Sequence, residues 1–488
     1  MSHGHAVVIG GSMAGMCAAK AVAPHFDRVT VVDRDAYPGE PVYRKGVPQA
    51  RHVHALLARG RNGLEQLFPG FAERMIAAGA SDADAGLHFA TLRKHGWQRR
   101  LPSQVPLLLS SRVLLEFTVR ELLRQTPNVT FVESTDVVGL TLGDGEPRRV
   151  IGVSVTPAGA GEGTASQIRA GDGAASRIRA GEGAASRITA DLVIDAGGRG
   201  SRAPAWLAAA GLAVPQETVV DCFAGYSTRW YQAPPAGHWP RDWWWRGLWI
   251  EPDPPDELMG GVLFPVEGGR WIVTLIGHAR HYPPTDEAGF NAALRSLRSP
   301  AIAEAVALAE PISPVYGNRS LSNRFRHYER LREPLGGFVA VGDGVCVFNP
   351  NYGQGMSTAA LSALTLARSV ATAGAGFGPG FARSFFRAQA RAFEDAWLLA
   401  TGADLDFPGA VGKPPPGRSV LGPYVAAVFD EMRTDPVVLR GGMEILHLLR
   451  PTTAFFALPL LSRVAWRALR GLLRRGQREP IPTMPELC

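Results

Sequence analysis

A short apolar segment that runs directly into a glycine-rich turn constrains this chain more than any other feature. Residues 6–9 are apolar and predict a buried strand, and Gly10, Ser12 and Gly15 follow in the order of the G-x-G-x-x-G pattern. Gly10 gives the backbone freedom at the turn, and Gly15 lets the next helix pack closely on the strand. The free N–H groups and positive dipole end of that helix suit a pyrophosphate. The segment predicts a strand–turn–helix unit that binds a dinucleotide.

An acidic residue after the next predicted strand supports the same prediction. Residues 28–32 are rich in valine and threonine, and Asp33 follows them, eighteen residues after Gly15. A carboxylate near this spacing binds ribose hydroxyls. Ser12 stands in place of the middle glycine; its small side chain still lets the backbone approach a phosphate, and its hydroxyl can donate a hydrogen bond. An ordinary strand–turn–helix in an α/β core is the alternative left open.

The composition describes a globular protein of more than one domain. The 488 residues are too many for one simple core, and 46% hydrophobic against 19% charged residues excludes a disordered chain. The net charge is +7, but the basic residues are scattered and nearly all are arginine, which indicates a coding bias instead of a nucleic-acid footprint. We therefore expect no nucleic-acid partner.

The four cysteines are widely spaced and form no C-x-x-C pair, which argues against disulfides or zinc and fits a reducing compartment. They are Cys17, Cys222, Cys346 and Cys488. A strand is predicted almost at Met1, so no signal peptide is expected. No apolar run reaches the roughly 20 residues that cross a bilayer. We expect a cytoplasmic protein with no transmembrane segment and no metal.

The following segments extend the α/β pattern and then interrupt it. A cationic loop covers residues 43–54, helix is expected over residues 55–80, and a capped amphipathic helix over residues 110–123 carries Arg112 in its first turn. Residues 160–190 contain a decapeptide repeat with one acidic residue in each copy, too few for a calcium site. An expansion within a surface hairpin is favoured over a β-solenoid, and we assign it no chemistry.

The second half of the chain has three parts. Residues 205–320 carry clustered tryptophans and hairpin signals, including two strands joined at Gly268 and Gly269, and predict a mostly antiparallel sheet. The last hundred residues predict helices. Their final stretch, residues 445–475, combines leucines with arginines. It could rest on a membrane surface, but a helix packed over the flavin domain with a solvated arginine face is favoured.

A second glycine motif stands some 330 residues after the first. An apolar strand over residues 338–341 leads into Gly342 and Asp343, and residues 350–357 follow with the sequence PNYGQGMS. Residues 353–356 begin a predicted helix, whose N-terminal N–H groups stabilise negative charge. In this order and at this separation, the two motifs predict a chain that holds one dinucleotide from both ends.

Together these segments resemble the FAD-dependent monooxygenases of the p-hydroxybenzoate hydroxylase type, from residue 5 to about 408 without the insert. Within that superfamily, residues 44–52, 269–274, 348–357 and 395–401 look most like the olefin epoxidases of polyether antibiotic biosynthesis. The resemblance implies an α/β fold: a Rossmann-like FAD-binding domain of the glutathione-reductase type, an inserted antiparallel β-sheet substrate domain and a helical C-terminal region. The implied parts are FAD-binding segments 1–204 (with the repeat) and 321–385, the substrate domain 205–320 and the helical region 386–488.

The resemblance also implies a flavin site made from both motifs. Asp343 would accept a hydrogen bond from the ribityl chain, Arg112 would contact the phosphate or ribityl side, and Pro350 would lie beside the isoalloxazine. Gly353, Gly355 and Met356 would start a helix beside that ring. The complete set of implied cofactor-binding residues is Gly10, Ser12, Ala14, Gly15, Asp33, Arg34, Arg44, Lys45, Gln49, Arg112, Asp343, Pro350, Gly353, Gly355 and Met356.

The implied reaction is monooxygenation. Reduced FAD would add O2 to give a C4a-hydroperoxide, which would epoxidise an olefin of a lipophilic polyketide or terpenoid secondary metabolite. Because this transfer needs a dry cavity more than acid–base groups, no separate catalytic residue is assigned. Hydroxylation of an aromatic or polyketide ring, reduction of an isoprenoid double bond, and flavin binding without oxygenase activity stay open.

The electron donor would be NAD(P)H directly or a separate flavin reductase. Residues 197–201 lack the acid that the superfamily often carries in its middle motif, which weighs against direct reduction by a bound nicotinamide.

Two histidines, one cysteine and the tryptophan cluster each allow a chemical and a structural interpretation. His52 and His54 lack a third metal ligand nearby, so contact of His52 with the flavin edge is favoured over metal binding. Cys346 lies near the second motif, but nothing marks it as an activated thiolate, so packing is favoured. The spacing of Trp245 and Trp249 does not match the W-x-W-x-I-P signature of flavin-dependent halogenases, so halogenation is not expected.

Overall fold

The computed structural model describes residues 3–146, 148–159, 186–319, 321–374 and 376–473. Most of the decapeptide repeat, residues 160–185, lies outside the described residues. The strands on its two sides, Val150–Pro157 and Ser186–Thr189, pair in antiparallel fashion. This pairing is the hairpin frame that the sequence predicted for the insert.

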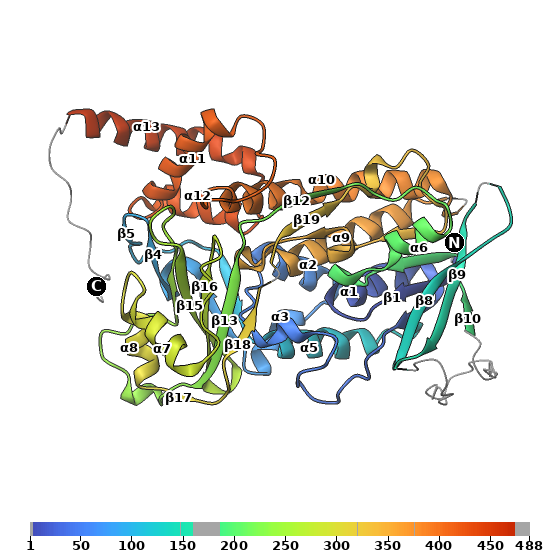
Figure 1. Cartoon of the computed structure of the whole chain (residues 1–488), viewed down its shortest axis with the longest axis horizontal. Coiled ribbons are helices and arrows are strands. Elements are labelled where there is room, and N and C mark those ends of the chain that lie inside the picture. The colour runs from blue at the N-terminus through green and yellow to red at the C-terminus, as the bar shows by residue number, and fades with distance from the viewer. Residues whose placement is uncertain (1–2, 147, 160–185, 320, 375, 474–488) are drawn as a thin grey trace.

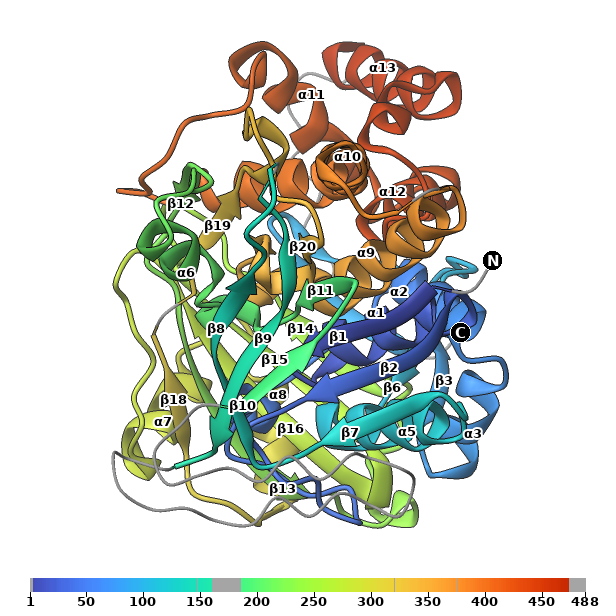
Figure 2. The same cartoon turned by 90° about the vertical axis from the view of Figure 1, so that its right-hand side faces the viewer.

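A five-stranded parallel sheet forms the centre of the α/β part, and Figure 2 shows its strands side by side. In spatial order its strands are β20 (Phe338–Ala340), β11 (Leu192–Asp195), β1 (His3–Ile9), β2 (Phe26–Val32) and β7 (Val129–Val132). Helix α1 (Met13–Val22) packs against α9 (Gln354–Ala371) and α5 (Arg112–Arg124). Strands separated by hundreds of residues therefore become neighbours in the core.

An eight-stranded, mostly antiparallel sheet forms the second part, at the left of Figure 1. The predicted hairpin is present as β15 (Met259–Val266) and β16 (Arg270–Gly277). Two strands of this sheet precede residue 205, since β4 (Phe89–Arg93) pairs in parallel with β14 (Gly247–Ile250) and β5 (Gly96–Trp97) pairs with β4. The remaining strands are β13 (Gly225–Gln232), β17 (Glu310–Pro311) and β18 (Tyr316–Asn318).

The two faces of this sheet pack on different neighbours. Leu263 and Val273 belong to the core that includes residues of α7 (Glu287–Arg295) and α8 (Ala301–Ala307), together with the tryptophan cluster. The adjacent residues Phe264 and Ile272 point to the other face and belong to a separate core, together with Val53 of the cationic loop and Ala55 just after it. This second face, the inner face, therefore looks toward the glycine motifs.

The expected helix over residues 55–80 is two helices. Helix α2 (Ala58–Leu67) ends before α3 (Phe71–Ala77), and Gly70 between them has φ +82°. This left-handed backbone conformation is one that glycine adopts without strain. The capped helix is confirmed, because the Ser111 hydroxyl accepts a hydrogen bond from the Leu114 N–H at 3.1 Å.

Shorter elements connect the two sheets. The α/β side also carries β8 (Thr135–Leu142), β9 (Val150–Pro157), β10 (Ser186–Thr189) and α6 (Ala203–Ala209). The connections between the sheets contain β3 (Ser81–Asp84), α4 (Ala85–His88), β6 (Pro106–Leu109), β12 (Glu217–Val220), β19 (Asn323–Arg326) and β21 (Cys346–Val347).

The C-terminal part is helical, as predicted, and lies along the top of Figure 1. Its helices are α10 (Pro379–Asp404), α11 (Arg418–Glu431), α12 (Pro436–Leu446) and α13 (Leu458–Leu473). Helix α13 packs through Leu460 and Val464 on the other C-terminal helices, α11 and α12, whereas the sequence had favoured packing over the flavin domain. Arg467 pairs with Glu431 at 2.8 Å, and Leu458 and Trp466 are exposed. Within the described residues, no helix combines the length and apolar composition needed to span a bilayer.

Candidate functional site

The glycine-rich turn joins β1 to α1 through close backbone contact. Gly10 has φ +91°, and a Cβ atom on Gly15 would lie 1.8 Å from the Gly10 carbonyl oxygen. A side chain at position 15 would therefore push the helix off the strand. Ser12 precedes α1, but its side chain makes no capping hydrogen bond, so the first N–H groups of the helix are left for another acceptor.

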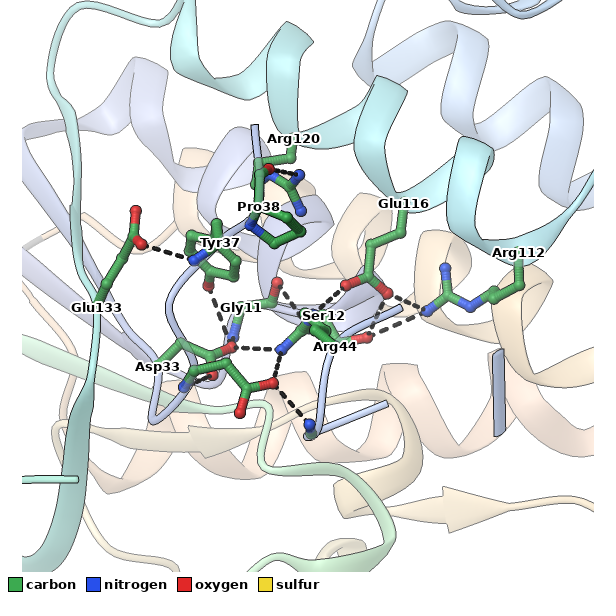
Figure 3. Close-up of polar contacts among 12 residues, drawn as sticks. Gly11, Ser12, Asp33, Tyr37, Pro38, Arg44, Arg112, Glu116, Arg120 and Glu133 are labelled. Carbon is green, nitrogen blue, oxygen red and sulfur yellow. Dashed lines mark hydrogen bonds and ion pairs between the residues drawn. The ribbon is translucent and has the colours of Figure 1, made fainter. Parts of the chain in front are cut away.

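Asp33 follows β2 and lies beside this turn, as Figure 3 shows. Its carboxylate accepts hydrogen bonds from the Gly11 N–H at 2.7 Å and the Tyr37 hydroxyl at 3.1 Å. The predicted ribose-binding acid is thus buried against the predicted pyrophosphate turn. The neighbouring Arg34 is exposed.

A chain of ion pairs runs from Asp33 to helix α5 (Figure 3). The Arg44 guanidinium lies 2.8 Å from Asp35 and 2.7 Å from Glu116, and the other oxygen of Glu116 lies 3.0 Å from Arg112. Arg112 also donates to the Ser12 hydroxyl at 3.1 Å. The sequence predicted Arg44 and Arg112, whereas Glu116 was missed, because only the folded loop brings its carboxylate between the two arginines.

The chemistry of these groups suits the phosphates of a dinucleotide. The Arg112 Nη1 atom is buried and has no partner among the described residues, so one of its donors is free for a ligand oxygen. The cavity between Tyr43, Arg44, Arg112 and Glu116 has a volume of only about 20 Å³.

The second motif packs directly on the first. A Cβ atom on Gly342 would lie 2.6 Å from the Cβ of Ala14, so the turn after β20 touches the first turn of α1. Asp343 follows, and a Cβ atom on Gly355 would lie 3.7 Å from its carboxylate. Burial raises the pKa of the Asp343 carboxyl above its ordinary value, opposed by the charges of Arg199 and then Arg112.

The turn Asn349–Gly353, here called the proline turn, is held by a buried polar network. Asp404, at the end of α10, accepts hydrogen bonds from Tyr352 at 2.6 Å, Asn349 at 2.9 Å and Asn323 at 2.6 Å. Burial raises the pKa of Asp404, and the hydrogen bond from Tyr352 opposes that rise most. Sequence reasoning missed Asp404 and Asn323, because no spacing rule links positions so far apart.

The remaining predicted residues differ in exposure. Pro350 in the proline turn is exposed, Gly353 has φ +64° and starts α9, and Met356 is buried. In the cationic loop, Lys45 and Gln49 are exposed and do not line the pocket described above.

Two histidines connect the cationic loop to the inner face of the large sheet. His52 is hydrogen-bonded through Nδ1 to the Thr228 hydroxyl at 2.8 Å, and its ring packs on Tyr226. The His54 Nδ1–H donates to the His52 carbonyl at 3.0 Å. Burial lowers the pKa of His52 to about 4 and that of His54 to about 3, so both rings are neutral at neutral pH.

The described residues offer no metal site and no reactive thiol. No group of three or more His, Cys, Asp or Glu side chains among them could hold a metal ion. Cys17, Cys222 and Cys346 are buried, and burial raises the pKa of the Cys346 thiol well above its ordinary value. A thiol that stays protonated is a poor nucleophile, which agrees with a packing role.

Comparison with known proteins extends over the whole chain. No known family profile matches it. Protein Rv3254 of Mycobacterium tuberculosis is 30% identical over 495 aligned residues, which cover 98% of this chain and 97% of that protein. The chain belongs to the family of Rv3254.

Solved structures of flavoenzymes share the fold. The flavin-dependent brominase Bmp2 matches 96% of this chain and 99% of its own, with a TM-score of 0.64 and 14% identity. A flavoprotein/dehydrogenase from Cytophaga hutchinsonii matches 96% of this chain and 100% of its own, with a TM-score of 0.64 and 15% identity. The probable FAD-dependent monooxygenase pqsL from Pseudomonas aeruginosa matches 82% of this chain and 97% of its own, with a TM-score of 0.57 and 14% identity. These likenesses confirm the predicted fold.

Proposed function

We propose that this protein is an FAD-dependent monooxygenase that acts on a lipophilic substrate. The observation that carries the proposal is the contact between the two glycine motifs, in which Gly342 packs on Ala14 and Asp343 lies at the start of α9. A strand–turn–helix unit alone is common in α/β proteins. A second turn that meets it from the far end of the chain supports one extended cofactor held between them.

Each part of the site has a distinct task in this proposal. The N-terminus of α1 would hold the pyrophosphate, Asp33 a ribose, and Arg112 with Asp343 the ribityl and phosphate side. The N-terminus of α9 would stabilise negative charge on the reduced ring. Lys45 and Gln49 are exposed, so they would lie at the edge of the cofactor site.

The bound flavin would supply the activation of O2, and the protein would supply water exclusion and orientation. The inner face of the large sheet is apolar and buried, which suits a lipophilic olefin and excludes water from it. Its members include Tyr226, Trp230, Val262, Phe264, Ile272 and Ile276. We therefore propose epoxidation first and ring hydroxylation second. Halogenation, known from proteins of the same fold, is an outcome of the experiment below.

Flavin binding is tested first. The purified protein should bind FAD, and Asp343→Ala should weaken binding about ten- to a hundredfold because a charge-assisted hydrogen bond is lost. Asp256→Ala, a change of the same kind at an exposed position, is the matched control. An Asp343→Ala protein with wild-type affinity would remove Asp343 from the site.

Oxygen transfer is tested with ¹⁸O2 and candidate olefins, with chloride and bromide present and with either NADPH alone or a separate flavin reductase. A product heavier by one labelled oxygen atom supports monooxygenation, and product NMR separates epoxide from alcohol. A halogenated product, or label taken from water, contradicts the proposal. Fast reduction by NADPH without substrate would exclude only the need for a reductase.

A further inference from the structure

The two histidines of the cationic loop carry their protons on opposite ring nitrogens. The partner of the His54 Nδ1 atom is a carbonyl oxygen, which only accepts, so Nδ1 of His54 carries the proton and Nε2 is bare. The partner of the His52 Nδ1 atom is a hydroxyl, which either donates or accepts. Which ring nitrogen of His52 carries the proton therefore depends on the other hydrogen bond of the Thr228 hydroxyl.

The position of the His52 proton is set by a pair of threonines, Thr228 and Thr274. The Thr228 hydroxyl is also hydrogen-bonded to Thr274 at 2.7 Å, and both threonines are fully buried at paired positions of β13 and β16. Thr274 has no further side-chain hydrogen bond in the described part of the chain. A buried hydroxyl proton without an acceptor is costly, so Thr274 must donate its proton to the Thr228 oxygen. Thr228 must then donate its own proton to the Nδ1 atom of His52. His52 then carries its proton on Nε2.

The surroundings of His52 place this N–H beside the proline turn. The His52 ring packs on Tyr226, whose hydroxyl lies 3.5 Å from the Asn349 side-chain oxygen. A Cβ atom on Gly353 would lie 3.1 Å from the Ala55 carbonyl, so the chain after His52 also touches the start of α9. No acceptor for the His52 Nε2–H is found among the described residues.

We propose that His52 is a fixed hydrogen-bond donor to the ring edge of the flavin, and that Thr228 and Thr274 are positioning residues that hold its proton on Nε2. This inference rests on the proposed function. The ring edge of a flavin carries acceptors at N5 and the C4 carbonyl, which match an N–H donor. Because a neutral donor favours negative charge on the reduced ring, the contact also raises the reduction potential of the bound flavin.

The protonation states are tested without flavin, by ¹⁵N NMR of the imidazole rings at pH 7.5. His52 should show the Nε2–H form and His54 the Nδ1–H form. His447, whose Nδ1 accepts from the Ala58 N–H at 3.2 Å far from the threonine pair, should show Nε2–H in every variant and serves as internal reference. Thr228→Val should bring His52 into a mixture of both forms. A wild-type His52 protonated on Nδ1 would overturn the inference.

The flavin contact is tested by FAD titration and by the reduction potential of bound FAD. His52→Leu should weaken FAD binding about tenfold and lower the potential, and His52→Gln, which keeps an N–H donor, should restore part of both. Thr228→Val should act in the same direction with a smaller effect. The matched control is Thr141→Val, since the Thr141 hydroxyl is buried without a partner in the described residues.

Failure of this inference differs from failure of the proposed function. A wild-type protein that binds no FAD contradicts the proposed function and this contact with it. A wild-type protein that binds FAD, with His52→Leu and Thr228→Val both indistinguishable from Thr141→Val in affinity and potential, contradicts this inference alone.

Discussion

The glycine-rich turn and the proline turn each lead into a helix, but different contacts stabilise them. Each contains a glycine with positive φ, Gly10 at +91° and Gly353 at +64°, and each leads directly into a helix, α1 or α9. The first turn closes chiefly through close backbone contact, since the Gly15 backbone rests against the Gly10 carbonyl, and the Asp33 carboxylate adds one hydrogen bond to the Gly11 N–H. The second is held by side chains from distant segments, which meet at Asp404.

This difference separates two kinds of sensitivity. A turn closed by backbone contact is damaged by any added side chain, because there is no space for a Cβ atom. A turn held by a buried carboxylate tolerates changes of its own backbone better than loss of that carboxylate, which leaves several donors without acceptors. The predictions below test this contrast.

The largest effect is expected for Gly15→Ala. The added Cβ would meet the Gly10 carbonyl oxygen at 1.8 Å, so α1 must move away from β1. The free energy of unfolding should fall by about 4 kcal/mol, beyond the usual range for overpacking because the contact is with backbone. Urea denaturation measures the loss. Gly39→Ala, where no atom lies within 4 Å of the added Cβ, should be nearly neutral, and an equal loss there would contradict the explanation.

Asp404→Ala should have the next largest effect. The Tyr352, Asn349 and Asn323 side chains would lose their common acceptor inside the protein. A loss of about 3 kcal/mol in unfolding free energy is expected, together with weaker FAD binding, because the proline turn loses its support. Denaturation and FAD titration measure the two effects. Stability within 0.5 kcal/mol of wild type, a limit taken from ordinary surface changes, would show that the network does not hold the turn.

Acid should destabilise the protein through histidines, none of which belongs to the glycine-rich turn. Burial lowers the pKa of His52, His278 and His447 to about 4 and that of His54 to about 3, all below the unfolded value of about 6.5. The native protein binds fewer protons than the unfolded chain, so stability is complete above pH 6.5 and falls as the pH drops toward 4. Between pH 7.5 and 6.0 the expected loss from these four histidines is about 3 kcal/mol.

The pH effect is measured by urea denaturation across this range, with His278→Phe as the test variant. His278 stacks on Phe407, and its Nε2 atom is buried without a partner in the described residues, so phenylalanine keeps the packing and removes one titrating group. About a quarter of the pH dependence of these four histidines should disappear. Asp404 acts in the opposite direction, since its raised pKa makes its contribution grow as the pH falls through that value. Stability that stays flat between pH 7.5 and 6.0 would contradict the prediction.

The smallest effect is expected for Tyr352→Phe. It removes one hydrogen bond to Asp404 and leaves those from Asn349 and Asn323, so about 1 kcal/mol should be lost. FAD affinity should fall as well. Tyr424→Phe removes a comparable hydrogen bond, from the hydroxyl to the Phe455 carbonyl at 2.7 Å, in the C-terminal helices. It should cost similar stability without any change in FAD binding; if both variants bind FAD equally, the proline turn has no special link to the cofactor.

Much of the fold was predictable because its signals are local. The Gly10 turn, the Ser111 cap and the hairpin around residues 267–269 each depend on neighbours a few residues away. Asp33 was found from its fixed spacing after the Gly10 turn, within one strand–helix–strand unit. The break at Gly70 was missed within an expected helix, since one glycine carries little information about whether a helix ends or continues.

The sequence by itself determined the two glycine motifs, their order and the type of sheet between them, because turn geometry and strand alternation are properties of consecutive residues. Only the tertiary structure decided that β4 and β5 join the large sheet, that Glu116 bridges Arg44 and Arg112, and that Asp404 supports the proline turn. It also decided which ring nitrogen of His52 carries the proton, through Thr228 and Thr274. These pairs depend on which faces of distant segments meet, and no local periodicity encodes that choice.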